Sequence, residues 1–303
     1  MGEGGARRRV RAGPPKVRPG VVADQGPGYS PGMPNSPPHV PADLEQVRDA
    51  AWRYVKDTPG YLSENEARFL MLAAACAPVP GTIVEIGSFK GRSTVALASV
   101  AKHYRLGRVH AVDPHTAPSS TDPSLHGKAT SFDDFLANVA RAGVTDVVAP
   151  HRMYSRDFAL TFAEPIRLLW IDGDHTEAGA RADLEMFRPH LVAGAIVAMH
   201  DVLGTWYGSL KVFCDDVLGS DDFGVAGFCG SIGWAQYTPG AGHTPRRRWR
   251  RARLALPARQ LLPVARTGEG LVGLNKLRYK LWRPLAPHGA VDAKRWVNEV
   301  STY

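Results

Sequence analysis

The sequence predicts an α/β fold in which a largely parallel sheet is flanked by helices. Short apolar runs alternate with helical patterns from residue 82 to residue 200, as in strand–helix–strand units. The first apolar run ends in a glycine-containing turn that leads directly into a helix, and two last apolar runs, 224–228 and 232–237, fit an antiparallel hairpin. One large domain with appendages is expected rather than two equal domains.

The expected strands cover residues 82–86, 108–113, 147–152, 167–171 and 195–200. The expected helices between and after them cover residues 93–103, 132–142, 155–162 and 178–190. Before the first strand, residues 41–77 have apolar residues at helical spacing, and Ser63 followed by Glu66 is typical of a capping box at a helix N-terminus. We expect this helical extension to help close the site that the sheet forms.

The two ends of the chain differ from its centre in composition and charge. Residues 1–41 contain nine prolines and no periodic apolar pattern, which predicts a disordered tail. Residues 240–303 carry fourteen Lys and Arg against three acidic residues, whereas the net charge of residues 41–239 is −7. An acidic centre argues against nucleic-acid binding. The predicted division is therefore a tail (1–41), a central domain (42–239) and a basic, partly helical extension (240–303).

Within the basic extension, leucines recur at helical spacing beside lysines and arginines: Leu271, Leu274, Leu277 and Leu281. Such a helix can lie on an anionic membrane, with residues 246–283 as the contact, or dock on its own domain, and the sequence leaves both open. No apolar run reaches the ~18 residues that span a membrane. With no secretory pattern and three scattered cysteines, a cytoplasmic location is expected, with membrane-peripheral contact and homo-oligomerisation as open alternatives.

Polar residues follow the strands at the edge where open parallel sheets bind ligands. The first strand ends at Glu85 and Gly87, and Gly91 follows four residues later, which suits a nucleotide-like ligand at a helix N-terminus. Asp113 ends the second strand where an acid can bind ribose hydroxyls. The spacing of the two glycines does not match the nicotinamide-binding pattern. Acids and histidines end the fourth and fifth strands: Asp172, Asp174, His175, His200 and Asp201.

In this order, the motifs resemble those of class I S-adenosylmethionine (SAM)-dependent methyltransferases, in particular a small bacterial subgroup similar to sugar O-methyltransferases. The resemblance covers residues 63–237 and implies a Rossmann-like seven-stranded sheet of order 3-2-1-4-5-7-6, with SAM as the methyl donor. The motifs are Val84-Glu85-Ile86-Gly87-Ser88 with Gly91, Asp113-Pro114-His115, Ile171-Asp172-Gly173-Asp174-His175 and His200-Asp201.

The resemblance also implies roles for individual residues in binding SAM. The two glycines would border its methionine part, Glu85 would anchor its amino group directly or through water, and Asp113 would bind its ribose. Residues 154 and 155 would lie near the adenine. Phe89 stands where relatives have a glycine, so the backbone is expected to approach SAM less closely there. The full predicted set is Glu85, Gly87, Ser88, Gly91, Asp113, Tyr154, Ser155 and Asp172.

For catalysis, the resemblance implies that Asp172 and Asp201 match acids that hold magnesium in sugar and catechol O-methyltransferases. The predicted metal set is Asp172, Asp201 and His200, for magnesium or another divalent cation. His200 stands where those relatives have a carboxylate, which weakens the case for magnesium or suggests a softer ion. His175, three residues after Asp172, matches the general base of macrolide-sugar O-methyltransferases. A neutral imidazole suits that role near pH 7, and His200 is the second candidate base.

The expected function is SAM-dependent methylation of a hydroxyl on a sugar or another polyhydroxylated metabolite. A phenol, carboxylate or amine acceptor is the alternative within enzymes, and a non-catalytic cofactor-binding module or a membrane-peripheral scaffold is the alternative outside them. The sequence does not identify the acceptor, because acceptor pockets come from loops such as 115–130 and 203–209 and the fold does not fix them.

Overall fold

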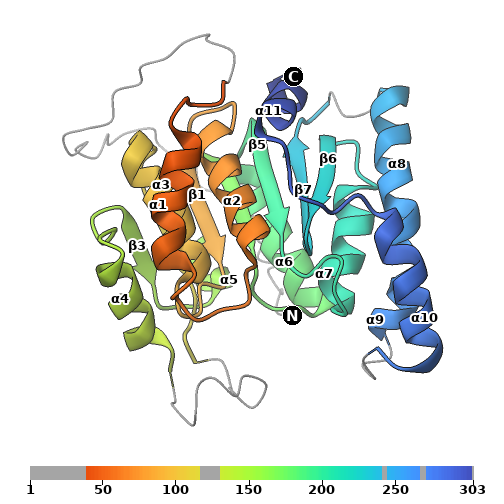
Figure 1. Ribbon diagram of the computed structural model, residues 1–303, viewed down its shortest axis with the longest axis horizontal. Helices are drawn as coiled ribbons and strands as arrows, with labels where there is room; N and C mark the ends of the chain where they lie inside the picture. Colours follow the sequence, from red (N-terminus) through yellow and green to blue (C-terminus); the bar gives the residue numbers. More distant parts are fainter. Residues whose placement is uncertain (1–38, 117–129, 241–243, 267–270, 302–303) are drawn as a thin grey trace, which may run out of the picture. The chain divides into compact units, whose positions relative to one another are not determined.

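The computed structural model describes residues 39–116, 130–240, 244–266 and 271–301 (Figure 1). Most of the predicted disordered tail, up to residue 38, lies outside these described residues, as does most of the 115–130 loop. Among the described helices, none has the length and hydropathy needed to cross a membrane.

The sheet has seven strands in the order β3-β2-β1-β4-β5-β7-β6, which confirms the predicted topology. Strands β1 to β5 pair in parallel, whereas β7 pairs antiparallel with both β5 and β6. The strands are β1 (Thr82–Ile86), β2 (Val109–Val112), β3 (Val148–His151), β4 (Ile166–Ile171), β5 (Leu191–Met199), β6 (Phe223–Cys229) and β7 (Ile232–Tyr237).

Helices cover both faces of the sheet, which explains why its central strands are apolar without alternation. Along β4, Leu168 and Trp170 point into one core, and Leu169 and Ile171 point into the other, as the two-residue period of a strand requires. The first core is completed by α1 (Leu44–Val55), α2 (Glu64–Cys76), α3 (Arg92–Tyr104), α4 (Phe132–Arg141) and α11 (Ala293–Ser301). The second is completed by α5 (Ser155–Ala159), α6 (Glu177–Phe187), α7 (Tyr207–Val212), α8 (Pro245–Arg259) and α9 (Leu262–Arg266).

Several element boundaries differ from the sequence-based expectation, such as that of α5, which ends at Ala159 rather than at residue 162. Two of the differences have a clear local reason. The helix expected over 178–190 ends at Phe187, because Pro189 follows and only a short 3₁₀ turn, Arg188–His190, continues the chain. The fifth strand begins at Leu191 rather than 195, because Leu191 pairs with Ile166 at the start of β4.

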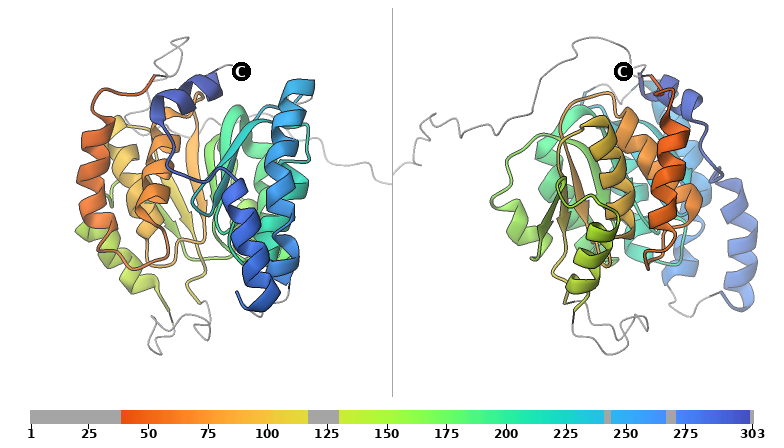
Figure 2. Two further views of the ribbon diagram at one scale, coloured as in Figure 1. Left: turned by 45° about the vertical axis from the view of Figure 1, so that its right-hand side comes forward. Right: turned by 60° about the vertical axis from the view of Figure 1, so that its left-hand side comes forward.

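Much of the basic extension packs on the rest of the chain. Ala255 and Ala258 of α8 are buried in the second core. Trp296 of α11 lies against Phe69 and Trp234 in the first core, with ring centroids 6.2 and 5.7 Å away. Figure 2 shows α8 and α11 against the sheet-bearing part from two further sides. The remaining helix of the extension, α10 (Gly273–Trp282), presents a different surface, described below.

The predicted capping box at α2 is confirmed. The backbone N–H and the hydroxyl of Ser63 both donate to Oε2 of Glu66, at 2.9 and 2.6 Å. The other carboxylate oxygen of Glu66 faces away from this cap. It accepts hydrogen bonds from the backbone and hydroxyl of Ser231, at 2.6 and 2.8 Å, in the turn between β6 and β7. Glu66 therefore joins the N-terminal helices to the far side of the sheet.

Candidate active site

A cavity of about 1370 Å³ lies at the carboxyl ends of the parallel strands. Its walls come from the turn after β1, the ends of β2 and β4, and the loop after β5. The segment between α1 and α2, including Pro59 to Leu62, forms a further part of the wall. The volume exceeds the range of about 300–1,000 Å³ typical of a pocket for one small ligand. The site therefore has room for a cofactor and an acceptor together.

The structure brings six of the eight predicted cofactor-binding residues to this cavity: Gly87, Ser88, Asp113, Tyr154, Ser155 and Asp172. The Asp113 carboxylate is fixed on both oxygens, because the backbone N–H groups of Phe89 and His115 each donate to it at 2.7 Å. A carboxylate oxygen can accept a second hydrogen bond, so Asp113 can still bind a ribose hydroxyl. Ser155 is less free, since its hydroxyl donates to Asp183 at 2.6 Å.

The glycines of the loop after β1 also have a structural role, beside the cofactor contact predicted for them. Gly87 has φ +86°, and a Cβ there would lie 2.1 Å from the carbonyl oxygen of Asp172. Glycine at this position is therefore required by the packing of the loop on the end of β4. Gly91 has φ +88° and does not line the cavity; its Cβ would meet the ring of Phe135 at 3.2 Å. Phe89 itself has a positive φ of 44°.

We expect Gly87→Ala to lower the free energy of unfolding by at least about 3 kcal/mol, because a strained φ adds to a backbone overlap. Gly107→Ala is the matched control: Gly107 has φ +90°, and nothing lies within 4 Å of its Cβ position. This control should cost about 1–2 kcal/mol, from the strained φ alone. Urea unfolding measures both variants. Equal losses in the two would show that the overlap at Gly87 is relieved by a small shift.

Glu85 does not line the cavity, and its predicted contact with the amino group of SAM, directly or through water, stays a prediction. Its side chain is fully buried, and its two carboxylate oxygens accept hydrogen bonds from the hydroxyls of Ser93 and Thr94, both at 2.5 Å. Glu85 thus ties the end of β1 to the first turn of α3. Burial raises the pKa of Glu85 to about 8, despite these two hydrogen bonds.

The raised pKa makes Glu85 a pH-dependent element of stability. A carboxyl group whose folded pKa exceeds its unfolded value stabilises the protein below the unfolded value, and this contribution is lost as pH rises through the folded pKa. Relative to Glu85→Gln, the unfolding free energy of the native protein should fall by up to about 1.4 kcal/mol per pH unit between about pH 4.5 and 8. Urea unfolding at pH 5, 6, 7 and 8 tests this; parallel curves for the two proteins would show that Glu85 does not titrate there.

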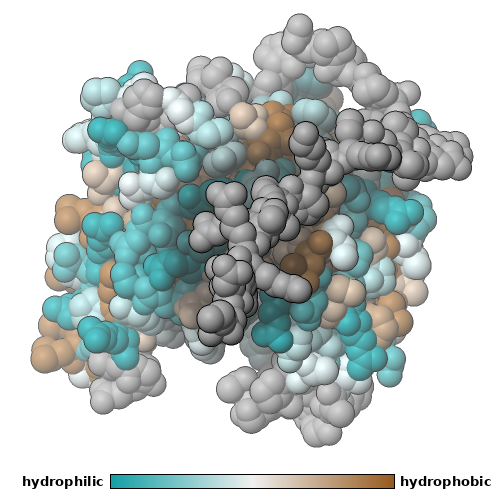
Figure 3. All heavy atoms as spheres, turned by 180° about the vertical axis from the view of Figure 1, so that it is seen from behind, coloured by the Kyte–Doolittle hydropathy of each residue, from teal (hydrophilic) through white to brown (hydrophobic). Residues whose placement is uncertain are grey.

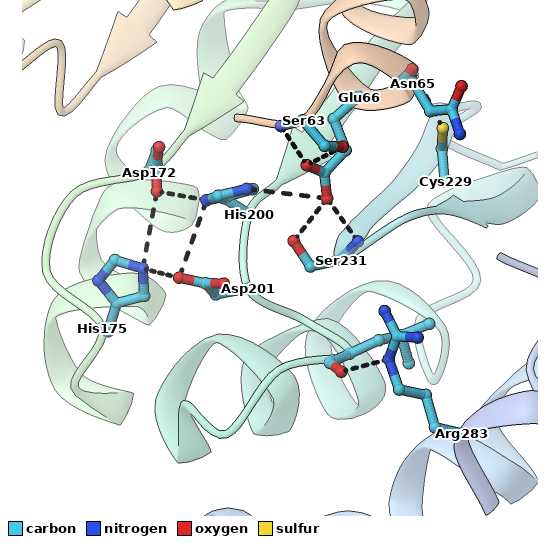
Figure 4. A network of polar contacts seen from close by, with 11 residues as sticks. Ser63, Asn65, Glu66, Asp172, His175, His200, Asp201, Cys229, Ser231 and Arg283 are labelled. Atoms are coloured by element: carbon cyan, nitrogen blue, oxygen red, sulfur yellow. Dashed lines mark hydrogen bonds and ion pairs between the residues drawn. The ribbon is translucent and has the colours of Figure 1, made fainter. Parts of the chain in front are cut away.

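At the other end of the cavity, the ends of β4 and β5 place four ionisable side chains together (Figure 4). Nε2 of His175 lies 3.1 Å from Oδ2 of Asp201 and 3.6 Å from Oδ1 of Asp172. Nδ1 of His200 lies 3.1 Å from the same Asp172 oxygen. The ring of His175 also packs against that of Trp206, with centroids 4.7 Å apart. His175, Asp172 and Asp201 all line the cavity.

The surroundings of the two histidines act on their protonation in the same direction. Burial disfavours the charged form of His200, but Asp172 beside Nδ1 and Glu66 facing Nε2 outweigh it, so its pKa lies well above 6.5. Burial likewise opposes the charged form of His175, but Asp201 and Asp172 raise its pKa above 6.5. His200 is held between carboxylates on both ring nitrogens, whereas His175 contacts them through Nε2 alone.

The predicted metal set of Asp172, Asp201 and His200 stays a prediction, and the structure offers a second set beside it. Among the described residues, the ligand atoms that lie within 4.8 Å of one another belong to Asp172, His175 and Asp201. His200 lies outside this group, although its Nδ1 is 3.1 Å from Oδ1 of Asp172 and 3.8 Å from Oδ2 of Asp201; its Nε2 points toward Glu66, 3.9 Å away. Sequence reasoning also missed Glu66 as a neighbour of the site. Its partner Ser231 lies 165 positions away in the chain, so only the folded arrangement reveals the link.

Comparison with known proteins agrees with this arrangement. A family model described as a methyltransferase domain matches residues 84–202, from β1 to just beyond β5. Residues 84–202 are a methyltransferase domain. The match includes the glycine loop, Asp113 and the cluster of Asp172, His175, His200 and Asp201, and it confirms the prediction of a SAM-dependent methyltransferase.

Solved structures of methyltransferases are similar to this chain over most of their own length. The O-methyltransferase NovP has 14% sequence identity and a TM-score of 0.52, covering 64% of this chain and 98% of NovP, and this likeness shows the fold. CalS11, a TDP-rhamnose 3'-O-methyltransferase of calicheamicin biosynthesis, has 20% identity and a TM-score of 0.42. The match covers 65% of this chain and 96% of CalS11. TomG from Streptomyces achromogenes, an O-methyltransferase of tomaymycin synthesis, has 18% identity and a TM-score of 0.46. The match covers 66% of this chain and 92% of TomG.

Proposed function

We propose that this methyltransferase methylates a hydroxyl group of a polyhydroxylated acceptor, such as a sugar, with His175 as the general base. The single observation that carries this proposal is the pairing of His175 with Asp201 at 3.1 Å on the wall of the cavity. A hydroxyl is a weak nucleophile that must lose its proton during transfer, and an imidazole oriented by a carboxylate is suited to accept it.

In this proposal, each ring nitrogen of His175 has its own role. Asp201 and Asp172 both lie on the Nε2 side, so this nitrogen carries the proton in the neutral ring. Nδ1 then holds the free electron pair and takes the acceptor proton. Trp206 packs on the ring and limits its rotation. Asp174 and Asp201 on the cavity wall can accept hydrogen bonds from further hydroxyls of the acceptor.

The residues at the other end of the cavity fit SAM, which supplies an electrophilic methyl group on a positively charged sulfur when bound. The hydroxyl of Ser88 is buried and makes no hydrogen bond within the described part of the chain, and Ser88 lines the cavity. Such an unpaired polar group fits contact with a polar ligand. Asp113 would accept from the ribose, and Tyr154, half exposed on the wall, would lie at the adenine.

The proposal is tested by incubating the purified protein with methyl-labelled SAM and panels of sugars, phenols, carboxylates and amines. Labelled ethers formed from sugars or related polyols support it. Transfer to phenols, carboxylates or amines alone would show that the protein is a methyltransferase whose acceptor belongs to a different class from the one proposed. SAM binding without transfer to any panel would favour a non-catalytic module.

A bound divalent cation is a second candidate for activating the acceptor, and the grouping of Asp172, His175 and Asp201 favours it. Two carboxylates and an imidazole suit manganese or zinc better than magnesium. A cation held by Nε2 of His175 would leave the ring proton on Nδ1, so His175 could not also serve as the base. The ion would lower the pKa of an acceptor hydroxyl instead.

The two candidates make opposite predictions for metal removal. With His175 as the base, we expect turnover to remain within about twofold of its starting value after dialysis against excess chelator. Loss of turnover that manganese restores would establish the cation instead. Calorimetric titration of manganese into the native protein and Asp201→Asn adds a readout that does not depend on turnover, because the variant removes one ligand charge from the group.

A further inference from the structure

The outer side of α10 exposes a row of leucines. Leu274, Leu277 and Leu281 lie three and four positions apart, which places them on one side of the helix, and Leu285 follows in the short turn after it. Their exposed fractions are 83%, 64%, 58% and 59%. We call these four residues the leucine face. Figure 3, seen from behind, shows hydrophobic side chains among hydrophilic ones at the left-hand edge, which is the side of α8 to α10 in that view.

The leucine face is not needed to hold α10 in place, because the opposite side of the helix does this. Tyr279 and Trp282 pack against the second core. The Tyr279 hydroxyl donates to the carbonyl oxygen of Leu203 at 3.2 Å, and Arg283 donates to the same oxygen at 3.3 Å. α10 is therefore an amphipathic helix whose aromatic side is docked and whose aliphatic side is in solvent.

Cations border the leucine face on both sides. Lys276 and Lys280 lie along one edge and Arg278 along the other, and all three are exposed. Within residues 244–266 and 271–285, the described part of this region, there is no Asp or Glu. Among the described residues, no carboxylate forms an ion pair with these three cations. Exposed leucines between unpaired cations are typical of a helix that lies in a membrane interface.

We propose that the leucine face docks on an anionic lipid bilayer, with the leucines in the acyl boundary and the flanking cations among the headgroups. Charge complementarity supports this occupant, because lysines and arginines near a bilayer are attracted to anionic lipids. The same charges oppose a symmetric contact with a second copy of the chain, since a two-fold contact through α10 would bring like charges together.

The docking surface and the cavity share structural elements. Leu203, which holds Tyr279 and Arg283, lies two residues after Asp201. Val264 and Ala265 of α9 line the cavity itself. Figures 1 and 2 show α9 and α10 at the end of the sheet toward which the β1 and β5 arrows point, which is the end that carries the cavity. A bilayer bound by α10 would thus lie beside the acceptor-side wall of the cavity.

Co-sedimentation with vesicles of 30% phosphatidylglycerol and 70% phosphatidylcholine tests the proposal on the full chain. We expect the partition coefficient to fall at least tenfold on going to pure phosphatidylcholine. The triple variant Leu274→Gln, Leu277→Gln and Leu281→Gln should lower it by a similar factor on the anionic vesicles. Leu160→Gln is the matched control, since Leu160 is 84% exposed but lies at the end of α5, and it should bind as the native protein does.

The charge contribution is tested separately with Lys276→Glu and Lys280→Glu together. These should weaken binding at least tenfold, whereas Arg53→Glu with Lys56→Glu, two exposed cations at the end of α1, should have little effect. Circular dichroism and SAM affinity check that each variant is folded. Native-like vesicle binding by the triple leucine variant would overturn the proposal. So would sedimentation velocity showing that the leucine face forms a dimer which does not bind vesicles.

Discussion

His175→Ala is expected to lower kcat by about 10²–10⁴-fold while the affinity for SAM stays within about twofold of the native value. General-base assistance contributes a factor of this size, and the alanine variant lacks the His175 imidazole that takes the acceptor proton. His175 lies with Asp201 and Trp206 at the acceptor end of the cavity, away from Asp113 at the other end. Kinetics with saturating SAM and calorimetry of SAM binding measure the two quantities.

His175→Gln is the matched variant, because glutamine keeps polar atoms near Asp201 but has no basic nitrogen. Both variants should lose turnover to a similar extent. If either keeps more than a tenth of the native kcat, His175 does not act as the base, and His200 becomes the next residue to test. His200 also lines the cavity but is a less favourable base, since carboxylates face both of its ring nitrogens, Asp172 at 3.1 Å from Nδ1 and Glu66 at 3.9 Å from Nε2.

The fold could be predicted because each local signal agreed with the topology. β4 is buried along its whole length and apolar except for Arg167, as in a sheet covered on both faces, and its apolar residues alternate between two cores as expected. The strand order came from the resemblance of the motifs, and the observed pairing confirms it. Among the boundaries that differed, the end of α6 depended on the ring of Pro189, and the start of β5 at Leu191 depended on pairing with a strand distant in the sequence.

The site was predicted in position but not in all of its contacts. Sequence order places Asp172 and His175 at one strand end and Asp201 at the next, so their meeting follows from the parallel sheet. His200 faces carboxylates through both ring nitrogens, and His175 through one, because Glu66 of α2 lies on the Nε2 side of His200. The role of Gly87 likewise depends on the approach of the β4 backbone. Neither contact leaves a local signal in the sequence.

Asp113→Ala is expected to weaken SAM binding by about 10²-fold or more. Its carboxylate is the charged acceptor predicted for the ribose, and a hydrogen bond to a charged group contributes about 1.5–3 kcal/mol, so two such bonds amount to at least about a 10²-fold change in affinity. The same carboxylate also holds the backbone N–H groups of Phe89 and His115, so its removal loosens the turn after β1 as well. Calorimetry of SAM or S-adenosylhomocysteine binding measures the total loss.

Ribose recognition is separated from this loosening by a ligand that lacks both ribose hydroxyls. The native protein should bind S-adenosylhomocysteine at least about tenfold more tightly than its 2',3'-dideoxy analogue, because the analogue leaves the partly buried carboxylate of Asp113 without its ribose partners. In Asp113→Ala this preference should disappear, since a coupled pair loses its interaction energy when either member is removed. A variant that binds both ligands weakly yet keeps the full preference would show that Asp113 only supports the turn. In that case, another residue on the cavity wall must bind the ribose.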